Sequence, residues 1–365
     1  MKLCLGQLTR TGGLTLAVLL LAPALPSCSS ASAEEYPEAT RTAEQDLGSL
    51  PGYVTSIKPY VVSLSPEYAL QALLSAGDRV PRTSNPAEQY QMVGIPDGIG
   101  THKGSGNTTL LFMNHELGNA VLSEPIVGRP LNRGAHVSRL VLDGEGRVTS
   151  GDRAYASVWS ENTLVGPAAD VTNTTAGFAR FCSGSLAWRE AGFDRPIYFA
   201  GEESSGAGTF DGTGGLAIAV FDNELHTIPK FGRFPWENTL AQPKPGARTV
   251  LLGMEDGPAS TDNQLYLYVG HKERMRGATP MRRNGLDNGR LYAFVSDTPG
   301  IASEIEFTSG SIEGHWLEIP NAETLSDVQL EEAADAAGAF GFIRTEDAAF
   351  DPENPDVVYF VTTGS

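Results

Sequence analysis

Cysteine is scarce in this chain. Only three cysteines occur among 365 residues, and Cys4 and Cys28 both lie in an N-terminal segment with the features of a leader. Because Cys182 is then the single remaining thiol, no disulfide framework can form. Three interpretations of Cys182 stay open at this point: a buried small hydrophobic side chain, a nucleophile, or a thiolate metal ligand.

Basic residues are also few. Lys and Arg total 26 against 44 Asp and Glu, and the formal net charge is −18. We therefore expect no nucleic-acid partner, because nucleic-acid phosphates require a basic protein surface. The acidity itself has two interpretations: it keeps an exported protein soluble, or it binds hard cations such as calcium through carboxylate oxygens.

Long apolar runs are missing. The longest run, residues 14–25, is shorter than the ~20 residues of a membrane span, and it follows Lys2 and Arg10 as in a signal peptide. Residues 25–28 (Leu-Pro-Ser-Cys) resemble a lipobox that would place a lipid anchor on Cys28, whereas residues 31–33 (Ala-Ser-Ala) suit ordinary signal peptidase. We expect residues 1–33 to be a signal peptide or lipoprotein leader. The protein would be exported: periplasmic, a cell-surface lipoprotein, or secreted.

Helical periodicity is weak outside two short segments, residues 66–74 and 322–337. The rest consists of short Val, Ile, Tyr and Phe runs separated by turn residues, among them many of the 41 glycines and 23 prolines. This pattern predicts an all-β protein. We expect residues 34–84 to form an N-terminal extension and residues 85–365 to form the β domain.

An irregular internal repeat runs through the β domain. Four apolar segments that end in polar groups resemble one another: residues 110–116, 197–203, 265–271 and 357–363. A short strand is expected before each, around Val93, Cys182, Leu252 and Ile343. Repeats of several strands predict a β-propeller, with a β-sandwich as the alternative.

The last repeat is short. Residues 357–363 would be the second strand of a blade, with no partner strand after it, and folded proteins avoid such an exposed apolar edge. We therefore expect about four blades in this sequence and a propeller that is incomplete at the C-terminus.

Polar residues at equivalent strand ends would converge on the central channel of a propeller. The expected set is Asn114, His115, Glu116, Cys182, Glu202, Glu203, Glu255, Asp256, His271, Glu273, Arg344, Glu346 and Asp347. Carboxylates brought so close repel one another unless cations neutralise them. A thiolate selects a transition metal, whereas carboxylates suit hard cations, so a mixed site of iron or zinc beside calcium is expected. A Cys182 nucleophile is less favoured, because nearby acids raise a thiol's pKa.

Five motifs follow one another along the chain: Asn114-His115-Glu116, Arg180-Phe181-Cys182-Ser183-Gly184, Gly201-Glu202-Glu203, Glu255-Asp256 and Arg344-Thr345-Glu346-Asp347. In order and number they resemble the successive motifs of the PhoX-type alkaline phosphatases, over about residues 85–365. Two motifs depart from the family. Cys-Ser-Gly-Ser stands where the family has Cys-Ala-Gly-Gly, and Arg-Thr-Glu-Asp stands where it has Arg-Pro-Glu-Asp. The twin-arginine export signal common in the family is also missing.

The resemblance implies a six-bladed propeller for the full-length chain, with two oxide-bridged ferric ions and three calcium ions at the channel mouth. Cys182 matches the iron-binding thiolate, and Arg344 matches the catalytic arginine that clamps phosphate. Glu116 would face calcium. Further metal-binding acids would be Glu346, Glu255, Glu202, Glu203 and Asp256. Residues that support the ligands from behind would be Asn114, His115, His271 and Asp347. An aspartate ligand of the family would lie beyond Ser365.

The expected function is that of a metal-dependent phosphatase outside the cytoplasm. It would use Fe(III) and Ca²⁺ to hydrolyse small phosphomonoesters, with diesters as a further class, and it would act as a monomer. The alternative is a non-enzymatic, calcium-stabilised propeller that binds a ligand at the cell surface. Such a scaffold would need neither Cys182 nor Arg344.

Overall fold

The computed structural model describes residues 2–3, 52–258 and 260–364. The processing sites and Cys28 lie outside these residues. Strands make up 41% of the chain and helices 8%, so the prediction of an all-β protein is confirmed. No helix among the described residues is both long and apolar enough to cross a membrane.

The first blade-like sheet has four antiparallel strands. In sheet order they are β4 (Pro96–Lys103), β5 (Thr109–His115), β8 (His136–Leu142) and β9 (Val148–Arg153). Two hairpins accompany this sheet: β2 (Arg79–Pro81) with β3 (Gln89–Gln91), and β6 (Leu122–Ser123) with β7 (Asn132–Arg133). The segment that precedes them is tied to the same sheet, because Tyr53 forms a backbone bridge with Val148.

The second sheet repeats the pattern and extends it. Its order is β12 (Phe181–Ala187), β13 (Ile197–Glu202), β14 (Ala217–Phe221), β15 (Glu224–Thr227), β10 (Ser157–Ser160) and β11 (Thr163–Pro167). The first four strands are antiparallel neighbours, and β10 joins the outer edge parallel to β15.

The third and fourth sheets complete the described chain. The third contains β16 (Trp236–Ala241), β17 (Arg248–Glu255), β18 (Leu265–His271), β19 (Arg290–Ser296), β20 (Ile312–Ile319) and β1 (Lys2–Leu3). The fourth pairs β21 (Thr345–Phe350) with β22 (Val358–Thr362).

Helices are few and short. The α-helices are α1 (Pro280–Arg283) and α2 (Asp327–Ala336), and the 3-10 turns are η1 (Gly206–Gly208), η2 (Pro229–Phe231), η3 (Glu304–Glu306) and η4 (Ala322–Thr324). The Ser326 hydroxyl caps α2 by accepting from the Gln329 backbone. The helix expected within residues 322–337 is thus confirmed. The one expected at 66–74 is wrong: Tyr68 and Leu70 are exposed, and a short helix without tertiary packing is unstable.

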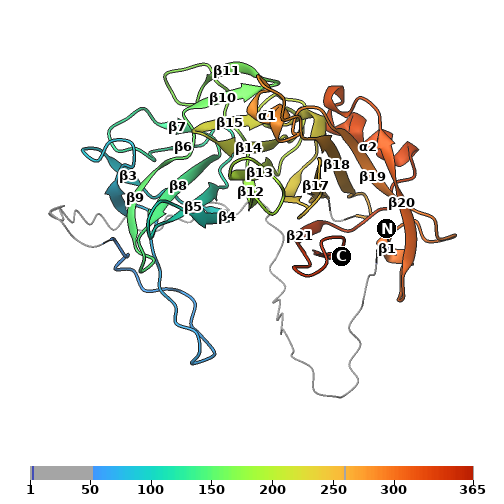
Figure 1. Ribbon diagram of the computed structural model, residues 1–365, viewed down its shortest axis with the longest axis horizontal. Helices are drawn as coiled ribbons and strands as arrows, with labels where there is room; N and C mark the ends of the chain where they lie inside the picture. The colour runs from blue at the N-terminus through green and yellow to red at the C-terminus, as the bar shows by residue number, and fades with distance from the viewer. Residues whose placement is uncertain (1, 4–51, 259, 365) are drawn as a thin grey trace.

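The first strands of the four sheets lie next to one another. Strand β12 contacts both β4 and β16, and β16 contacts β21. Figure 1 shows the sheets following each other in an arc, in chain order from the blue-green to the red end. A propeller would require such adjoining first strands. The propeller itself and the six blades expected of the full-length chain stay predictions.

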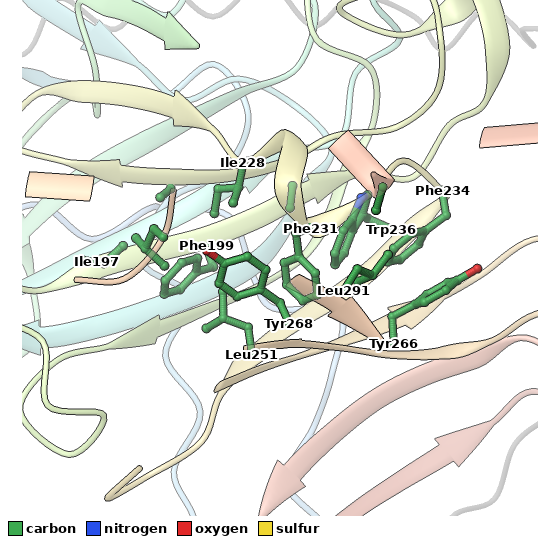
Figure 2. Packing of buried hydrophobic residues seen from close by; sticks show 14 of the residues in the cluster. Ile197, Phe199, Ile228, Phe231, Phe234, Trp236, Leu251, Tyr266, Tyr268 and Leu291 are labelled. Carbon is green, nitrogen blue, oxygen red and sulfur yellow. The ribbon is translucent and has the colours of Figure 1, made fainter. Parts of the chain in front are cut away.

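The largest apolar core lies between the second and third sheets. Figure 2 shows Phe199 of β13, Trp236 of β16 and Tyr268 of β18 within this cluster. Trp236 is fully buried, and its indole N–H donates to the Gly215 carbonyl at 3.1 Å. Each such side chain contributes roughly 1.5–3 kcal/mol of burial free energy. The packing of Trp236 fixes the start of β16, and with it the position of the next residue, Glu237.

The expected repeat is wrong in the third sheet. The counterpart of β5 and β13 there is β17 rather than residues 265–271, which form the third strand, β18. The first strand is β16, not a segment around Leu252, which lies inside β17. Strand β16 has the sequence Trp-Glu-Asn-Thr-Leu-Ala. Its three consecutive polar residues lack the apolar pattern by which the other strands were predicted.

Candidate metal centre

The four sheets begin in the same way. The first residue of each first strand pairs with the last residue of the second strand: Pro96 with His115, Phe181 with Glu202, Trp236 with Glu255, and Thr345 with Thr362. In every sheet the register then shifts before pairing resumes three residues later. Such bulges re-aim side chains. Four residues therefore occupy one equivalent position: Asp97, Cys182, Glu237 and Glu346.

A second set of acids follows the second strands. The backbone N–H groups of Glu116, Glu203 and Asp256 each donate, at 2.9–3.0 Å, to the carbonyl of the residue that precedes the first strand of the same sheet. These three acids therefore lie beside the bulges. The fourth sheet has Thr363 at this position, with the same bond to the Arg344 carbonyl at 3.0 Å.

The two sets merge into one cluster, which we call the inner-strand site. Three triplets have potential ligand atoms within 4.8 Å of one another: Asp97–Glu116–Cys182, Cys182–Glu203–Glu237 and Glu237–Asp256–Glu346. Because the triplets share Cys182 and Glu237, the seven groups form a continuous chain of donors. The structure thus brings together five residues expected from the sequence: Cys182, Glu346, Glu116, Glu203 and Asp256.

Asp97 and Glu237 were missed by the sequence interpretation. Each is the second residue of the first strand of its sheet, as Cys182 and Glu346 are. In the sequence these positions are marked by no more than an isolated acid directly after Pro96 or Trp236, which is too weak a pattern to predict a site residue. Glu237 is bound by Ser183, whose hydroxyl donates to its Oε1 at 2.5 Å. Ser183 is one of the departures from the family pattern, and here it joins β12 to β16.

Glu202 and Glu255 do not belong to the inner-strand site, contrary to the expectation for both. Side chains alternate along a strand, so Glu202 points away from its neighbour Glu203. The fully buried Glu202 carboxylate accepts backbone N–H groups from Ala179, Phe210 and Leu216, at 2.9, 2.8 and 3.2 Å. Glu255 accepts the backbone N–H of Gln264 at 2.9 Å. Both carboxylates fasten loops of their own sheets.

The expected supporting residues differ in placement. Asn114 holds the backbone beside the thiol, since its Nδ2 donates to the carbonyls of Cys182 and Ser183 at 2.7 and 3.1 Å. His115 is turned into its own sheet, where it bonds Ser138 and stacks on His136 at 4.5 Å.

Two other expectations can be compared with the fold. Asp347 accepts from the Asn238 side chain and so ties β21 to β16. The placement expected for His271 is wrong. It pairs with Arg248, at the opposite end of β17 from Glu255. Glu273 lies beyond that same end, where it accepts from the side chain of Asn288.

Two arginines border the inner-strand site. Arg344 directly precedes β21, and its Nε and Nη2 donate to the Asp256 carboxylate at 2.6 and 2.7 Å. Arg180, also missed by the sequence interpretation, directly precedes β12, and its Nη2 lies 2.9 Å from Glu116 and 2.8 Å from Glu203. The shared pattern of Arg, one residue, then a donor (Arg-Phe-Cys and Arg-Thr-Glu) is the signal that could have found it.

Burial and mutual repulsion dominate the electrostatics. Burial, with the charge of Glu346 and Glu203, raises the pKa of Glu237 to about 8. Burial also raises the pKa of Glu203 to about 7, although Arg180 opposes this. Burial and the surrounding acids raise the pKa of the Cys182 thiol far above its usual range. A neutral thiol is a poor nucleophile, whereas a bound cation reverses these shifts and favours thiolate and carboxylates.

Comparison with known proteins supports the family resemblance. A sequence model of the family described as alkaline phosphatase PhoX matches residues 223–365, which include β16, β17 and β21 of the inner-strand site. The chain resembles the PhoX alkaline phosphatases. Among proteins of curated function, none matches the chain significantly.

One solved structure is similar in fold to this chain. It is that of Pseudomonas fluorescens PhoX in complex with vanadate, a transition state analogue, with a TM-score of 0.53 and 16% sequence identity. The match covers 84% of this chain and 66% of that chain. This chain therefore spans about two thirds of the length of the PhoX protein, with which it shares the fold.

Proposed function

We propose that this protein is a metal-dependent phosphatase that hydrolyses phosphomonoesters outside the cytoplasm. The observation that carries the proposal is the inner-strand site itself. One thiol, six carboxyl groups and two guanidinium groups gather where the first strands of four neighbouring sheets begin. The PhoX match over residues 223–365 and the fold shared with a vanadate-bound phosphatase support the same activity.

The residues present fit a mixed iron and calcium site. A soft thiolate beside carboxylates suits a transition metal, and carboxylates alone suit calcium. We assign Cys182, Glu203 and Glu237 to iron, and we assign calcium to the remaining acids, Asp97, Glu116, Asp256 and Glu346. Seven acidic groups against two arginines leave an excess of negative charge. The raised pKa values of Glu203 and Glu237 express the same excess, which cations would remove.

When bound, Fe³⁺ and Ca²⁺ supply positive charge that neutralises the phosphoryl oxygens and lowers the pKa of water. The chain's own residues orient the reactants. Asn114 and Ser183 fix the directions of Cys182 and Glu237, as their hydrogen bonds indicate. Arg344, held by Asp256 on one side, would donate to a phosphoryl oxygen as negative charge develops in the transition state.

The leader supports export. We propose that residues 1–33 direct the protein out of the cytoplasm, with Cys28 as a lipid attachment point if the lipobox-like site is used. Small phosphate esters would then be the substrates met outside the cell membrane, and a monomer would suffice, because all seven donors come from one chain. Mass spectrometry of the mature N-terminus distinguishes a lipid-modified Cys28 from cleavage after Ala33.

The decisive experiment measures hydrolysis and metal content together. The full chain is loaded with Fe³⁺ and Ca²⁺ and assayed with p-nitrophenyl phosphate and bis(p-nitrophenyl) phosphate. We expect hydrolysis of the monoester, loss of activity on chelation, and restoration when both metals return. A protein that binds calcium and gains thermal stability but hydrolyses neither ester would be a calcium-stabilised binding module instead.

A further inference from the structure

Arg180 and Arg344 occupy the same position in two different sheets. Each directly precedes a first strand, and each has a left-handed backbone, with φ of 44° and 56°. The carbonyl of each accepts the backbone N–H of the residue after the second strand, Glu203 or Thr363. The two arginines are therefore structural counterparts within the internal repeat.

Their side chains also follow one rule. Each guanidinium reaches back to the acid that follows the second strand of the preceding sheet: Arg180 to Glu116 and Arg344 to Asp256. Ile95, which precedes β4, has the same left-handed backbone, with φ of 51°, so this conformation belongs to the start of the first strand in three of the four sheets. Arg180 and Arg344 differ from Ile95 in that their side chains reach acids of the site.

Arg180 is anchored without being covered. Its Nη2 lies between Glu116 and Glu203, at 2.9 and 2.8 Å, yet 43% of its side chain remains exposed, against 12% for Glu203. The Nε of Arg180 is buried and has no hydrogen-bond acceptor. The guanidinium is thus held in place while at least one of its N–H donors has no acceptor. In Arg344, by contrast, Nε and Nη2 both donate to Asp256.

The two arginines border one region of the site. Arg180 contacts Glu203, whose carboxylate forms a triplet with Cys182 and Glu237. Glu237 also belongs to the next triplet, with Asp256 and Glu346, and these two acids lie 2.6 and 3.6 Å from Arg344. The acids beside the two guanidinium groups therefore form one continuous cluster. An anion bound over this cluster would meet positive charge from two sides.

We propose that Arg180 is a second anion-binding arginine, which acts with Arg344 on the phosphoryl group of the substrate and selects dianionic monoesters over diesters. This inference rests on the proposed phosphatase function. A monoester dianion carries two charges and three non-bridging oxygens, which two guanidinium groups can match. A diester carries one charge and two such oxygens, so the second arginine adds less to its binding free energy.

The experiment compares Arg180→Met with Arg180→Lys in the full chain loaded with Fe³⁺ and Ca²⁺. The matched control is Arg189→Met, which removes the same charge just beyond the far end of β12, where Arg189 lies over the Trp188 ring at 4.3 Å. Three quantities are measured: bound metal, the Kd of orthophosphate by calorimetry, and kcat/KM for p-nitrophenyl phosphate and bis(p-nitrophenyl) phosphate.

For Arg180→Met we expect the Kd of orthophosphate to rise ~10–100-fold, the effect of one charge-assisted hydrogen bond. The ratio of monoester to diester kcat/KM should fall by about tenfold or more, with metal content unchanged. The control should match the wild type in all three quantities. Orthophosphate affinity and ester preference that stay at wild-type values in Arg180→Met would overturn the proposal.

Arg180→Lys separates anion binding from simple charge neutralisation. If Arg180→Met loses metal, lysine should restore metal content, because it keeps a charge beside Glu116 and Glu203, but not the monoester preference, because it lacks the planar fork. Lysine that restored both would make Arg180 a counter-cation only and would overturn the proposal. A wild type that hydrolyses neither ester would refute the phosphatase function instead, and orthophosphate affinity would still test Arg180.

Discussion

Arg344 and Asp256 form a two-bonded ion pair between neighbouring sheets. The guanidinium Nε and Nη2 lie 2.6 and 2.7 Å from the two oxygens of a carboxylate whose side chain is only 4% exposed, whereas 32% of the arginine side chain is exposed. Glu346 lies 3.6 Å from the same Nη2. One arginine therefore contacts two of the acids proposed to bind metal and remains partly exposed.

The first prediction concerns Arg344. Replacement by alanine should lower kcat/KM for p-nitrophenyl phosphate by a factor that corresponds to roughly 2–3 kcal/mol of transition-state stabilisation. The reason is that a charge-assisted hydrogen bond that strengthens in the transition state is lost. Metal content should stay unchanged. Arg344→Lys should recover only part of the rate, since lysine cannot form the two-bonded fork. Steady-state kinetics with metal analysis checks this, and equal rates in all three proteins would remove Arg344 from the mechanism.

The second prediction concerns Cys182. Cys182→Ser should abolish iron binding and any visible absorbance, because a hydroxyl is a poor replacement for a thiolate on iron. The fold should persist, since the Asn114 bonds go to backbone carbonyls that the substitution leaves in place. Iron analysis and the absorption spectrum are the measurements. Iron retained at the wild-type level would contradict the assignment of this thiol to the metal.

The third prediction concerns the pH dependence of chelation. Without cations, the pKa values of Glu203 and Glu237 rise to about 7 and about 8, above their unfolded values. The folded state then binds more protons, so these groups cost the metal-free protein stability as pH rises through 7 and 8. A chelator should therefore lower Tm more at pH 9 than at pH 6.

The matched variants for that measurement are Glu237→Gln and Glu318→Gln, the latter at an exposed pair with Arg290. The chelator-induced loss of Tm should differ less between pH 9 and pH 6 in Glu237→Gln, which lacks the buried acid. In Glu318→Gln, which lacks an exposed acid, this difference should match that of the wild type. A chelator effect that is the same at both pH values would mean that the acids of the site do not repel one another.

The fourth prediction concerns Glu202. Glu202→Gln should destabilise the protein by about 2–4 kcal/mol, because the amide NH₂ would face at least one of the three backbone N–H groups that the carboxylate oxygens now accept. Iron and calcium content of the folded protein should not change. Urea unfolding provides the free energy, again with Glu318→Gln as the control. Loss of metal without loss of stability would return Glu202 to the site as a ligand.

Part of the fold and site could be predicted from the sequence. The alternation of short apolar runs and turn residues was enough for the all-β class, because strand periodicity is local. The motifs around Cys182 and Arg344 were enough to place these residues near carboxylates. Cys182 and Glu346 do occupy equivalent positions, because each is the second residue of the first strand of its sheet.

Tertiary structure alone decided which acids face the site. Glu202 and Glu203 are neighbours in the sequence, yet one fastens loops by three backbone bonds and the other contacts Arg180. The bulge in each sheet sets this division by fixing register and direction. The same register brings Asp97 and Glu237 beside Cys182, over sequence separations that no local pattern spans. Sequence alone thus determined the kinds of donor available, whereas strand pairing determined which of them meet.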